Sequence, residues 1–209
     1  SPSKKIIVAG AAGFIGSSIC EYLLQIGSRV IGIDSLTHYY DLHLKRANLE
    51  SLESCPEFSF IEKSILNVDW SNLLEGVDTV YHQAAQAGVR ASWGRSFHCY
   101  TEWNVLATQH LLEALRGRRI RMVYASSSSV YGETNLLPMM EEHRPQPVSP
   151  YGVSKLAAEH LCFLYWRNFK VPTVSLRYFT VYGPRQRPDM PFHKFIRAAL
   201  TGRPITLYG

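Results

Sequence analysis

The 209-residue sequence has few cysteines and no long apolar run. Its four cysteines, Cys20, Cys55, Cys99 and Cys162, are far apart and include no C-x-x-C pair, which predicts reduced thiols that pack as small apolar side chains. No segment approaches the ~18 apolar residues that cross a bilayer, and no basic-then-apolar leader opens the sequence. These absences predict a soluble, cytoplasmic protein without a membrane partner.

The sequence gives little support for a metal site or a nucleic-acid-binding surface. The eight histidines lack metal-ligand spacing, so no metal is expected. The net charge is +5, but the basic residues are scattered, apart from a cluster at Arg116, Arg118, Arg119 and Arg121. That cluster is more typical of a solvated helix end than of a nucleic-acid surface, because no aromatic residues are interleaved with it. We therefore expect no nucleic-acid partner.

Strand and helix patterns alternate along the chain, and a hydrophobic content of 46% suffices for one substantial core. The strand runs are rich in Val, Ile, Ala and Tyr and are nearly continuous, as in a sheet that is buried on both faces. The sequence therefore predicts an α/β fold with a doubly wound parallel sheet of the Rossmann type. The expected strands are 4–10, 28–34, 58–63, 77–85, 119–126 and 171–179, and the expected helices are 14–27, 43–52, 72–76, 98–117, 149–169 and 192–204.

The segment GAAGFIG places Gly10, Gly13 and Gly16 between the first predicted strand and helix. A glycine-rich turn there lets the backbone approach a pyrophosphate, and the helix N-terminus offers unpaired N–H groups and a partial positive charge. Asp34 ends the second predicted strand, where a carboxylate accepts hydrogen bonds from ribose hydroxyls and repels a 2′-phosphate. These residues predict dinucleotide binding with NAD favoured over NADP. The alternative is a plain tight turn and a capping aspartate.

The pattern changes after residue 180. Segment 180–191 is rich in Pro, Arg and Gly and predicts a loop, one more helix follows, and 205–209 resembles the start of another strand. We interpret 1–180 as the NAD-binding domain and 181–209 as only the beginning of a smaller substrate-binding portion. On this interpretation the sequence is the N-terminal part of a longer chain.

Tyr151 and Lys155 are four residues apart at the start of a predicted helix, hence on one face, with Ser149 as the expected N-cap and Pro150 in the first turn. To act as a base near neutrality, a phenol of pKa near ~10 must become about 3 units more acidic. The Lys155 ammonium and a positively charged nicotinamide ring can lower the pKa of Tyr151 in this way. Taken alone, a helix surface that happens to carry both residues is the commoner explanation.

Four consecutive serines, 126–129, follow the predicted strand that precedes this helix. Ligands of parallel sheets bind beyond the carboxyl ends of the strands. A serine hydroxyl at this point can bond a reacting sugar oxygen and share its proton with Tyr151. The run therefore indicates the floor of a pocket rather than a flexible linker.

The segments GAAGFIG, HQAAQAGVR, SSSSVYG, YGVSK and RYFTVYGP, together with Asp34, resemble the extended short-chain dehydrogenase/reductase family. The likeness is strongest to NAD-dependent nucleotide-sugar 4-epimerases, particularly UDP-glucuronate 4-epimerases, whose second βα unit is similar to residues 33–49. The resemblance implies NAD as cofactor, a UDP-sugar as substrate and a homodimer in which the helices at 98–115 and Tyr151 pair across a two-fold axis. The alternative is that both helices simply pack on their own sheet.

The resemblance also implies roles for individual residues. Tyr151 is the catalytic base, Lys155 its partner, and Ser127 the catalytic Ser/Thr of the family. The implied cofactor residues are Gly10, Ala12, Gly13, Phe14, Ile15, Gly16, Asp34, Ser35, Ser64, Ile65, Gln83, Ala84, Ala85, Ala87, Asn104, Ser126, Tyr151, Lys155 and Tyr178. The implied substrate residues are Arg90, Ser127, Ser128, Thr180, Arg185 and Arg187.

The sequence departs from the family pattern in two respects, and it lacks the acidic residues that two related enzyme classes require. Ser64 stands where the family usually has an adenine-binding Asp, and the sequence is shorter than family members. Ser128 and Ser129 stand where 4,6-dehydratases carry an Asp–Glu pair and UDP-glucuronate decarboxylases a Glu, and serines cannot replace those acids. This favours oxidation and re-reduction at one carbon, converting UDP-glucuronate to UDP-galacturonate through a 4-keto sugar. A UDP-glucose/UDP-galactose 4-epimerase and a non-catalytic NAD-binding fragment remain the alternatives.

Overall fold

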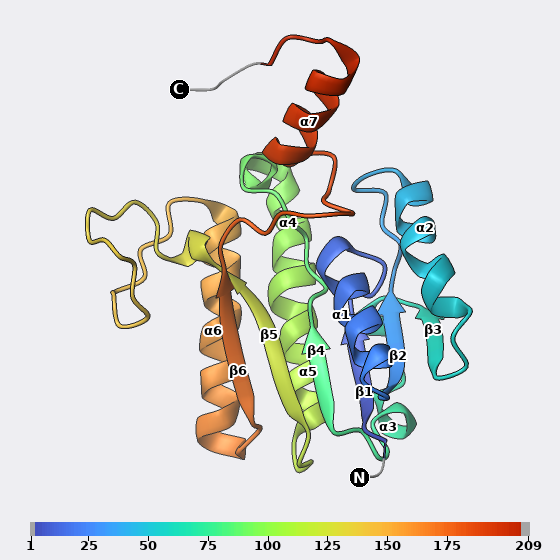
Figure 1. The fold of residues 1–209 in the computed structure, drawn as a ribbon. Helices are drawn as coiled ribbons and strands as arrows, with labels where there is room; N and C mark the ends of the chain where they lie inside the picture. Colours follow the sequence, from blue (N-terminus) through green and yellow to red (C-terminus); the bar gives the residue numbers. More distant parts are fainter. Residues whose placement is uncertain (1–2, 206–209) are drawn as a thin grey trace.

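A six-stranded parallel sheet forms the centre of the computed structural model, which describes residues 3–205 (Figure 1). The strands follow the order β3-β2-β1-β4-β5-β6, and every neighbouring pair is parallel. The order confirms the predicted doubly wound sheet and places its switch point between the carboxyl ends of β1 and β4, where such sheets bind ligands. The strands are β1 (Lys5–Ala9), β2 (Arg29–Asp34), β3 (Phe58–Glu62), β4 (Thr79–His82), β5 (Arg121–Ser127) and β6 (Thr173–Tyr178).

The helices follow the predicted order, with one difference. The helix expected over 98–117 consists of α4, a π-helical segment (Thr101–Leu106) and α5. A π turn holds an extra residue within a helix and is frequent at functional sites. The α-helices are α1 (Phe14–Gln25), α2 (Leu42–Glu53), α3 (Trp70–Leu73), α4 (Phe97–Tyr100), α5 (Ala107–Leu115), α6 (Pro150–Phe169) and α7 (Pro191–Thr201).

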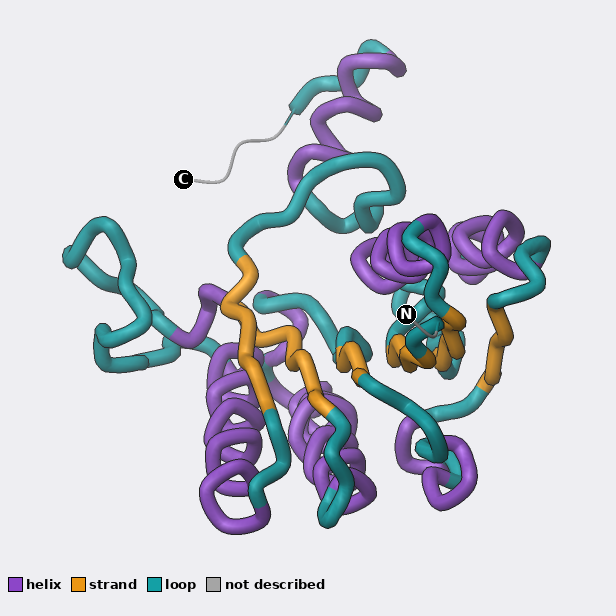
Figure 2. Tube along the Cα trace, turned by 60° about the horizontal axis from the view of Figure 1, so that its bottom comes forward, coloured by secondary structure: helices purple, strands orange, loops and turns teal. Residues whose placement is uncertain are grey.

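Helices cover both faces of the sheet (Figure 2). Neighbouring residues of a strand point to opposite sides, so each central strand contributes side chains to two cores. Val8 belongs to the core beneath α1 and α2, where it joins Leu23 and Leu49. Its neighbour Ile7 belongs to the core beneath α3, α5 and α6, which includes Leu111. The sheet is therefore the middle of three layers, and its upper edge in Figure 1 carries the carboxyl ends of all the strands.

The expectation that every strand is buried on both faces is wrong for β6. Val174 and Leu176 of this strand are exposed, whereas Arg177 bonds to Glu159 on α6. The reason is that α6 covers only one of its two faces within the described part of the chain. The apolar composition of β6 thus does not report its burial here.

α7 lies beyond the carboxyl edge of the sheet, and none of its residues is buried (Figure 1). The strand expected at 205–209 falls outside the described residues, apart from Ile205. The division of the chain near residue 180 stays a prediction. Within 3–205, no helix has the length and apolar character that crossing a bilayer requires.

Candidate active site

The turn between β1 and α1 is built on glycines because side chains do not fit there. Gly10 has a φ of +87°, and a Cβ on it would lie 2.7 Å from the backbone nitrogen of Ala84. A Cβ on Gly16 would lie 2.0 Å from the Gly10 carbonyl oxygen. Gly13 is the N-cap of α1, with no side-chain cap and no acidic residue in the first turn. The N–H groups of Phe14 and Ile15, in the first turn of α1, have no partner within the helix and are thus available to an anion.

Asp34 lies at the end of β2, directly beside the glycine turn. Its Oδ2 accepts a hydrogen bond from the Ala12 N–H at 3.1 Å, and its Oδ1 accepts one from the Leu36 N–H at 2.8 Å. Each carboxylate oxygen has a second acceptor site, so Asp34 can also receive hydroxyl donors. Ser35 follows it, and Ser64 after β3 caps a 3₁₀ turn by accepting from the Leu66 N–H at 3.3 Å.

α2 contributes two side chains that the sequence did not single out. Asn48 donates from Nδ2 to the Ala12 carbonyl at 2.9 Å, and buried Lys45 donates from Nζ to the Thr37 carbonyl at 2.8 Å. Burial lowers the pKa of Lys45, and the Asp34 carboxylate opposes that effect. Both residues occupy the inner side of an amphipathic helix, a pattern that sequence alone assigns to packing.

The loop after β4 forms the other wall of the switch point. The amide Nε2 and Oε1 of Gln83 are both buried, and neither meets hydrogen-bond geometry within the described chain. The Tyr178 phenol is a near neighbour: burial raises the pKa of Tyr178, and the Gln83 amide lowers it. Buried polar groups in folded proteins are normally paired, so an orphaned amide at this edge fits a ligand that supplies its partners. Ala84, Ala85 and Ala87 follow it in the same loop and are half-buried.

The implied cofactor role of Asn104 stays a prediction, and the structure gives its amide partners within the protein. This residue is buried in the π-helical segment and its amide is bonded to protein groups. Its Oδ1 accepts from the Gln86 N–H at 2.7 Å, and its Nδ2 donates to the Gln86 carbonyl and the Ser154 hydroxyl. Since both amide hydrogens are used, Asn104 holds the loop after β4 against α6.

The four serines 126–129 have different surroundings at the end of β5. The Ser126 hydroxyl donates to Glu159 at 2.5 Å, and its implied contact with the cofactor stays a prediction. Ser127 is buried, accepts from the Ser129 N–H at 3.1 Å and caps the 3₁₀ turn Ser128–Val130. Ser128 and Ser129 are half-buried. The structure thus sets Ser127 beside Tyr151, as a hydrogen-bond partner of its phenol.

Tyr151 occupies the first turn of α6. The Ser149 hydroxyl accepts from the Gly152 N–H at 3.0 Å and Pro150 opens the helix, as predicted. The Tyr151 ring meets Tyr100 edge to face, with ring centroids 6.2 Å apart. Tyr100 was not anticipated from the sequence, because it lies 51 residues earlier in a different helix.

The environment of Tyr151 differs from the expected one. Burial raises the pKa of Tyr151, while a hydrogen bond from Ser127 and the charge of Arg187 lower it. Lys155 is fully buried, and burial lowers the pKa of its amine to about 7. Its Nζ lies 6.0 Å from the Tyr151 ring centroid and donates to the Ala125 carbonyl at 2.9 Å. The protein alone therefore does not make this phenol acidic, and Arg187 is the cation whose charge lowers its pKa.

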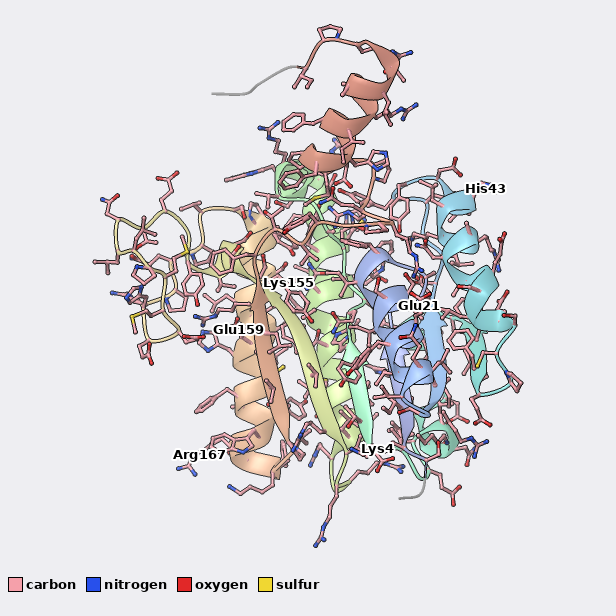
Figure 3. All side chains as sticks on the ribbon, in the orientation of Figure 1. Lys4, Glu21, His43, Lys155, Glu159 and Arg167 are labelled. Carbon is pink, nitrogen blue, oxygen red and sulfur yellow. The ribbon has the colours of Figure 1, made fainter. Side chains whose placement is uncertain are left out.

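Figure 3 shows Lys155 on the part of α6 near the carboxyl edge of the sheet, with Glu159 and then Arg167 further down the helix. The hydrogen bond from Lys155 to Ala125 joins α6 to β5 just before the serine run. Lys155 thus fixes the position of the first turn of α6, and with it Tyr151, against the end of β5.

The segment after β6 places the remaining candidates around the same edge. Arg187 is half-buried and forms an ion pair with Asp189, whereas Arg185 pairs with Glu21 on α1 at 2.9 Å. The exposed Thr180 follows β6, which ends at Tyr178. Arg90 is exposed and begins the 3₁₀ turn Arg90–Ser92. The charge of Arg187 lowers the pKa of Tyr151, whereas Arg185 is bonded to Glu21 on α1.

This chain is similar to known proteins along nearly its whole length. Residues 6–209 match the family model described as the NAD dependent epimerase/dehydratase family. The chain is 50% identical over 207 residues to an uncharacterized UDP-glucose epimerase, YtcB, of Bacillus subtilis (strain 168), covering 98% of this chain and 65% of that protein. It is 35% identical over 210 residues to a probable UDP-glucuronate 4-epimerase of Rhizobium meliloti (strain 1021), covering 98% and 61%.

Solved structures agree with this likeness. The crystal structure of UDP-glucuronic acid 4-epimerase from Bacillus cereus, in complex with UDP-glucuronic acid and NAD, matches with a TM-score of 0.95 and 50% identity over 98% of this chain and 66% of that one. The chain therefore spans between 61% and 66% of the length of these relatives.

Proposed function

The chain belongs to the NAD dependent epimerase/dehydratase family, and from this premise we propose that it inverts carbon 4 of UDP-glucuronate to give UDP-galacturonate. The observation that carries the proposal is the placement of Tyr151. Its phenol is half-buried at the carboxyl edge of the sheet, beside Ser127 and within electrostatic reach of Arg187. This edge also holds the glycine turn and Asp34, as a site that joins a dinucleotide to a sugar requires.

NAD is the cofactor of this family, and the residues at the switch point fit it. The α1 N-terminus and glycine turn would hold the pyrophosphate, Asp34 the adenosine ribose, and the orphaned Gln83 amide would gain partners. When bound, NAD supplies the site with an acceptor and donor of hydride and with a positive charge. That charge is what Tyr151 needs, because loss of solvent around the phenol raises its pKa.

The chain's own residues would then handle the proton and the orientation of the sugar. Tyr151 takes the proton of the 4-hydroxyl as carbon 4 is oxidised, and it returns that proton when the 4-keto sugar is reduced on its other face. Ser127 would donate to or accept from the sugar 4-oxygen, and its hydrogen bond with Tyr151 would hold the phenol in position. Lys155 holds the first turn of α6 against β5. These residues would move only the proton, which requires Tyr151 to lie within hydrogen-bond reach of the 4-hydroxyl.

A uronate substrate places a further demand on the site. Its 4-keto intermediate is a β-keto acid, which loses CO2 when the bond to the carboxylate aligns with the carbonyl π system. Ser128, Thr180 and Arg187 are our candidates for holding the carboxylate out of that alignment. Ser128 and Ser129 offer no carboxylic acid, which argues against dehydratase and decarboxylase chemistry.

The direct test is to incubate the protein, in its full natural length, with NAD and UDP-glucuronate and to identify the product by NMR. We expect UDP-galacturonate without release of CO2. A protein that interconverts only UDP-glucose and UDP-galactose would instead fit the second candidate, which the name of the 50%-identical Bacillus subtilis relative favours. Copurified NAD with no change of sugar stereochemistry would leave only a binding module.

The Tyr151→Phe variant tests the mechanism. Removal of the phenol oxygen takes away the general base, so we expect the rate of epimerisation to fall at least ~100-fold. NAD should remain bound, since the glycine turn and Asp34 are untouched, and bound NAD can be measured after denaturation of the variant. Full activity in Tyr151→Phe would refute the mechanism.

We also propose a cytoplasmic homodimer. All four cysteines are free, which suits a reducing compartment. The dimer is supported by apolar side chains on the outer side of α6, among them Val153 and Leu164, which are exposed in the single chain.

A further inference from the structure

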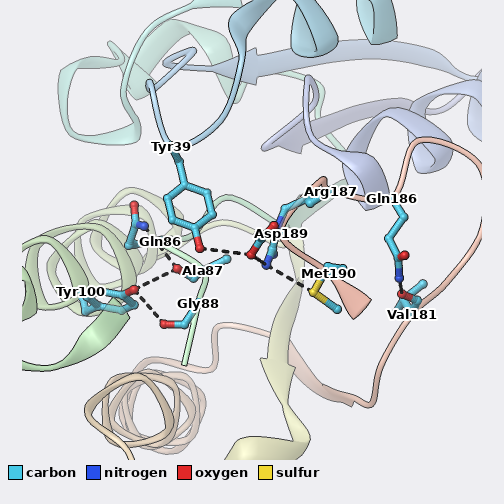
Figure 4. Close-up of polar contacts among 10 residues, drawn as sticks. All are labelled: Tyr39, Gln86, Ala87, Gly88, Tyr100, Val181, Gln186, Arg187, Asp189 and Met190. Atoms are coloured by element: carbon cyan, nitrogen blue, oxygen red, sulfur yellow. Dashed lines mark hydrogen bonds and ion pairs between the residues drawn. The ribbon is translucent and has the colours of Figure 1, made fainter. Parts of the chain in front are cut away.

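Arg187 is held by partners from two different loops. Its Nε and Nη2 donate to the two carboxylate oxygens of Asp189, each at 2.9 Å, in a bidentate pair. The Tyr39 hydroxyl donates to Asp189 Oδ2 at 3.3 Å, and the guanidinium lies 5.7 Å from the Tyr39 ring centroid. We call these three residues the Arg187 clasp (Figure 4). It joins the loop after β2 to the segment after β6, across the carboxyl edge of the sheet.

The third loop of this edge is shaped to receive Tyr39. Gly88, after β4, has a φ of +101°, and a Cβ on it would lie 2.4 Å from the Tyr39 hydroxyl oxygen. The Tyr100 hydroxyl donates to the carbonyls of Ala87 and Gly88 at 2.9 and 2.8 Å and so fixes this stretch of backbone. Tyr100 is also the ring that packs on Tyr151. The clasp is therefore connected through packed groups to the proposed catalytic base.

The clasp leaves part of the Arg187 guanidinium available. A guanidinium has five N–H donors, and the pair with Asp189 uses one on Nε and one on Nη2. The Nη1 donors lie outside that pair, and the side chain is 24% exposed. A planar fork that is already fixed on one carboxylate loses little freedom when it binds a second one.

We propose that Asp189 and Tyr39 are positioning residues, which hold Arg187 in place to bind the carboxylate of a uronate substrate. The inference rests on the proposed function, because it needs a UDP-sugar that carries a carboxylate. It assigns the preference for a uronate to the clasp as a unit. A neutral sugar at the same position would gain nothing from it.

A different role for Asp189 predicts the opposite change in uronate affinity when this residue is removed. If Asp189 were an internal counter-ion that the substrate must displace, its removal would free Arg187 and strengthen the binding of uronates. If it is a positioning residue, its removal lets the long Arg187 side chain leave the pocket, and binding weakens. Asp189→Asn decides between them, because it removes the charge and the bidentate acceptor with little change of volume.

Binding should be measured by calorimetry on the full-length protein with NAD, in a Tyr151→Phe background that blocks turnover. The two probes are UDP-glucuronate and UDP-glucose. We expect Asp189→Asn to weaken UDP-glucuronate about 10-fold and Tyr39→Phe to weaken it less, while UDP-glucose changes less than about 2-fold. In an Arg187→Met background, Asp189→Asn should add almost nothing, because positioning acts only through Arg187.

Glu57→Gln is the matched control, since it breaks a surface ion pair with Arg29 at the opposite edge of the sheet. It should change neither affinity. Retained NAD binding and an unchanged unfolding temperature show that each variant is folded.

Three outcomes would overturn the proposal: tighter binding of UDP-glucuronate by Asp189→Asn, equal losses for both nucleotides, or a full additional loss in the Arg187→Met background. Failure of the proposed function is distinguishable from all three. In that case the parent protein itself shows no preference for UDP-glucuronate, whichever clasp residue is present.

Discussion

Lys155 lies fully buried beneath the first turn of α6, where its amine donates to the Ala125 carbonyl. The sequence suggests an ammonium group whose main task is to acidify Tyr151. In the structure the transfer of the amine out of water is the larger effect, and it brings the pKa of Lys155 down to about 7. Part of the cationic support for Tyr151 comes instead from Arg187, on a segment that begins only after β6.

The buried amine predicts a pH-dependent stability. Its pKa is about 7 in the folded protein against 10.5 for an ordinary lysine, so the unfolded chain binds more protons between these values and stability rises with pH across that window. Between pH 7 and pH 9 the free energy of unfolding of the wild type should gain roughly 2 kcal/mol relative to Lys155→Met. Urea unfolding at the two pH values measures this, with Lys63→Met as an exposed control. Parallel pH profiles for the wild type and Lys155→Met would contradict a depressed pKa.

Residues that share one local element could be identified from the sequence. The glycine turn and the Tyr151–Lys155 pair depend on spacings within a single turn or helix, so the printed order of residues carries the geometry. The Arg187 clasp does not have this property, since Tyr39 and Asp189 are 150 positions apart and meet only because the sheet brings their loops together. Asn104 shows the converse, because a correct position near the site did not reveal that its amide is used by Gln86 and Ser154.

Among the elements, the central strands were predictable because their apolar runs are bounded by turn residues and buried on both faces. β6 shows the limit of that signal. Its composition is also apolar, but Val174 and Leu176 are exposed because no helix of the described chain covers that face of the strand. The π-helical segment Thr101–Leu106 could not be predicted, because an extra residue in a helical turn leaves the apolar pattern nearly unchanged. Helix ends with side-chain caps were better determined, as Ser149 illustrates.

The cap of α6 predicts a change that combines stability and activity. Ser149→Ala removes the acceptor for the Gly152 N–H and should cost about 1 kcal/mol, which corresponds to a fall of about 2–4 °C in the unfolding temperature. Because Tyr151 lies two residues further on, kcat should also fall several-fold. Asp69→Ala removes the cap of α3 at the Ser71 N–H and is the matched control. It should lower stability with kcat unchanged, and equal losses of kcat in the two variants would contradict a local role for Ser149.

The molecule as a whole has more apolar surface than its three layers cover. Phe192, Ile196 and Leu200 form an exposed apolar stripe along α7, and Val174 and Leu176 lie uncovered on β6. The outer side of α6 carries a third such surface. Apolar patches of this kind generally mark contacts with other protein surface. We propose that a second subunit contacts the outer side of α6.

The outer side of α6 predicts how the subunits associate. Val153 and Leu164 are 11 positions apart, hence on one stripe of the helix, and are 47% and 50% exposed. A charge placed on that stripe would have to be buried unpaired in a dimer, so Leu164→Asp should convert a dimer to a monomer in light scattering. Tyr22→Asp is the control, because Tyr22 is 63% exposed on α1, which packs on the other face of the sheet. If Leu164→Asp stays dimeric while Tyr22→Asp becomes monomeric, the two-fold contact lies on the α1 side. A wild type that is monomeric at all concentrations would mean that both α5 and α6 pack only on their own sheet.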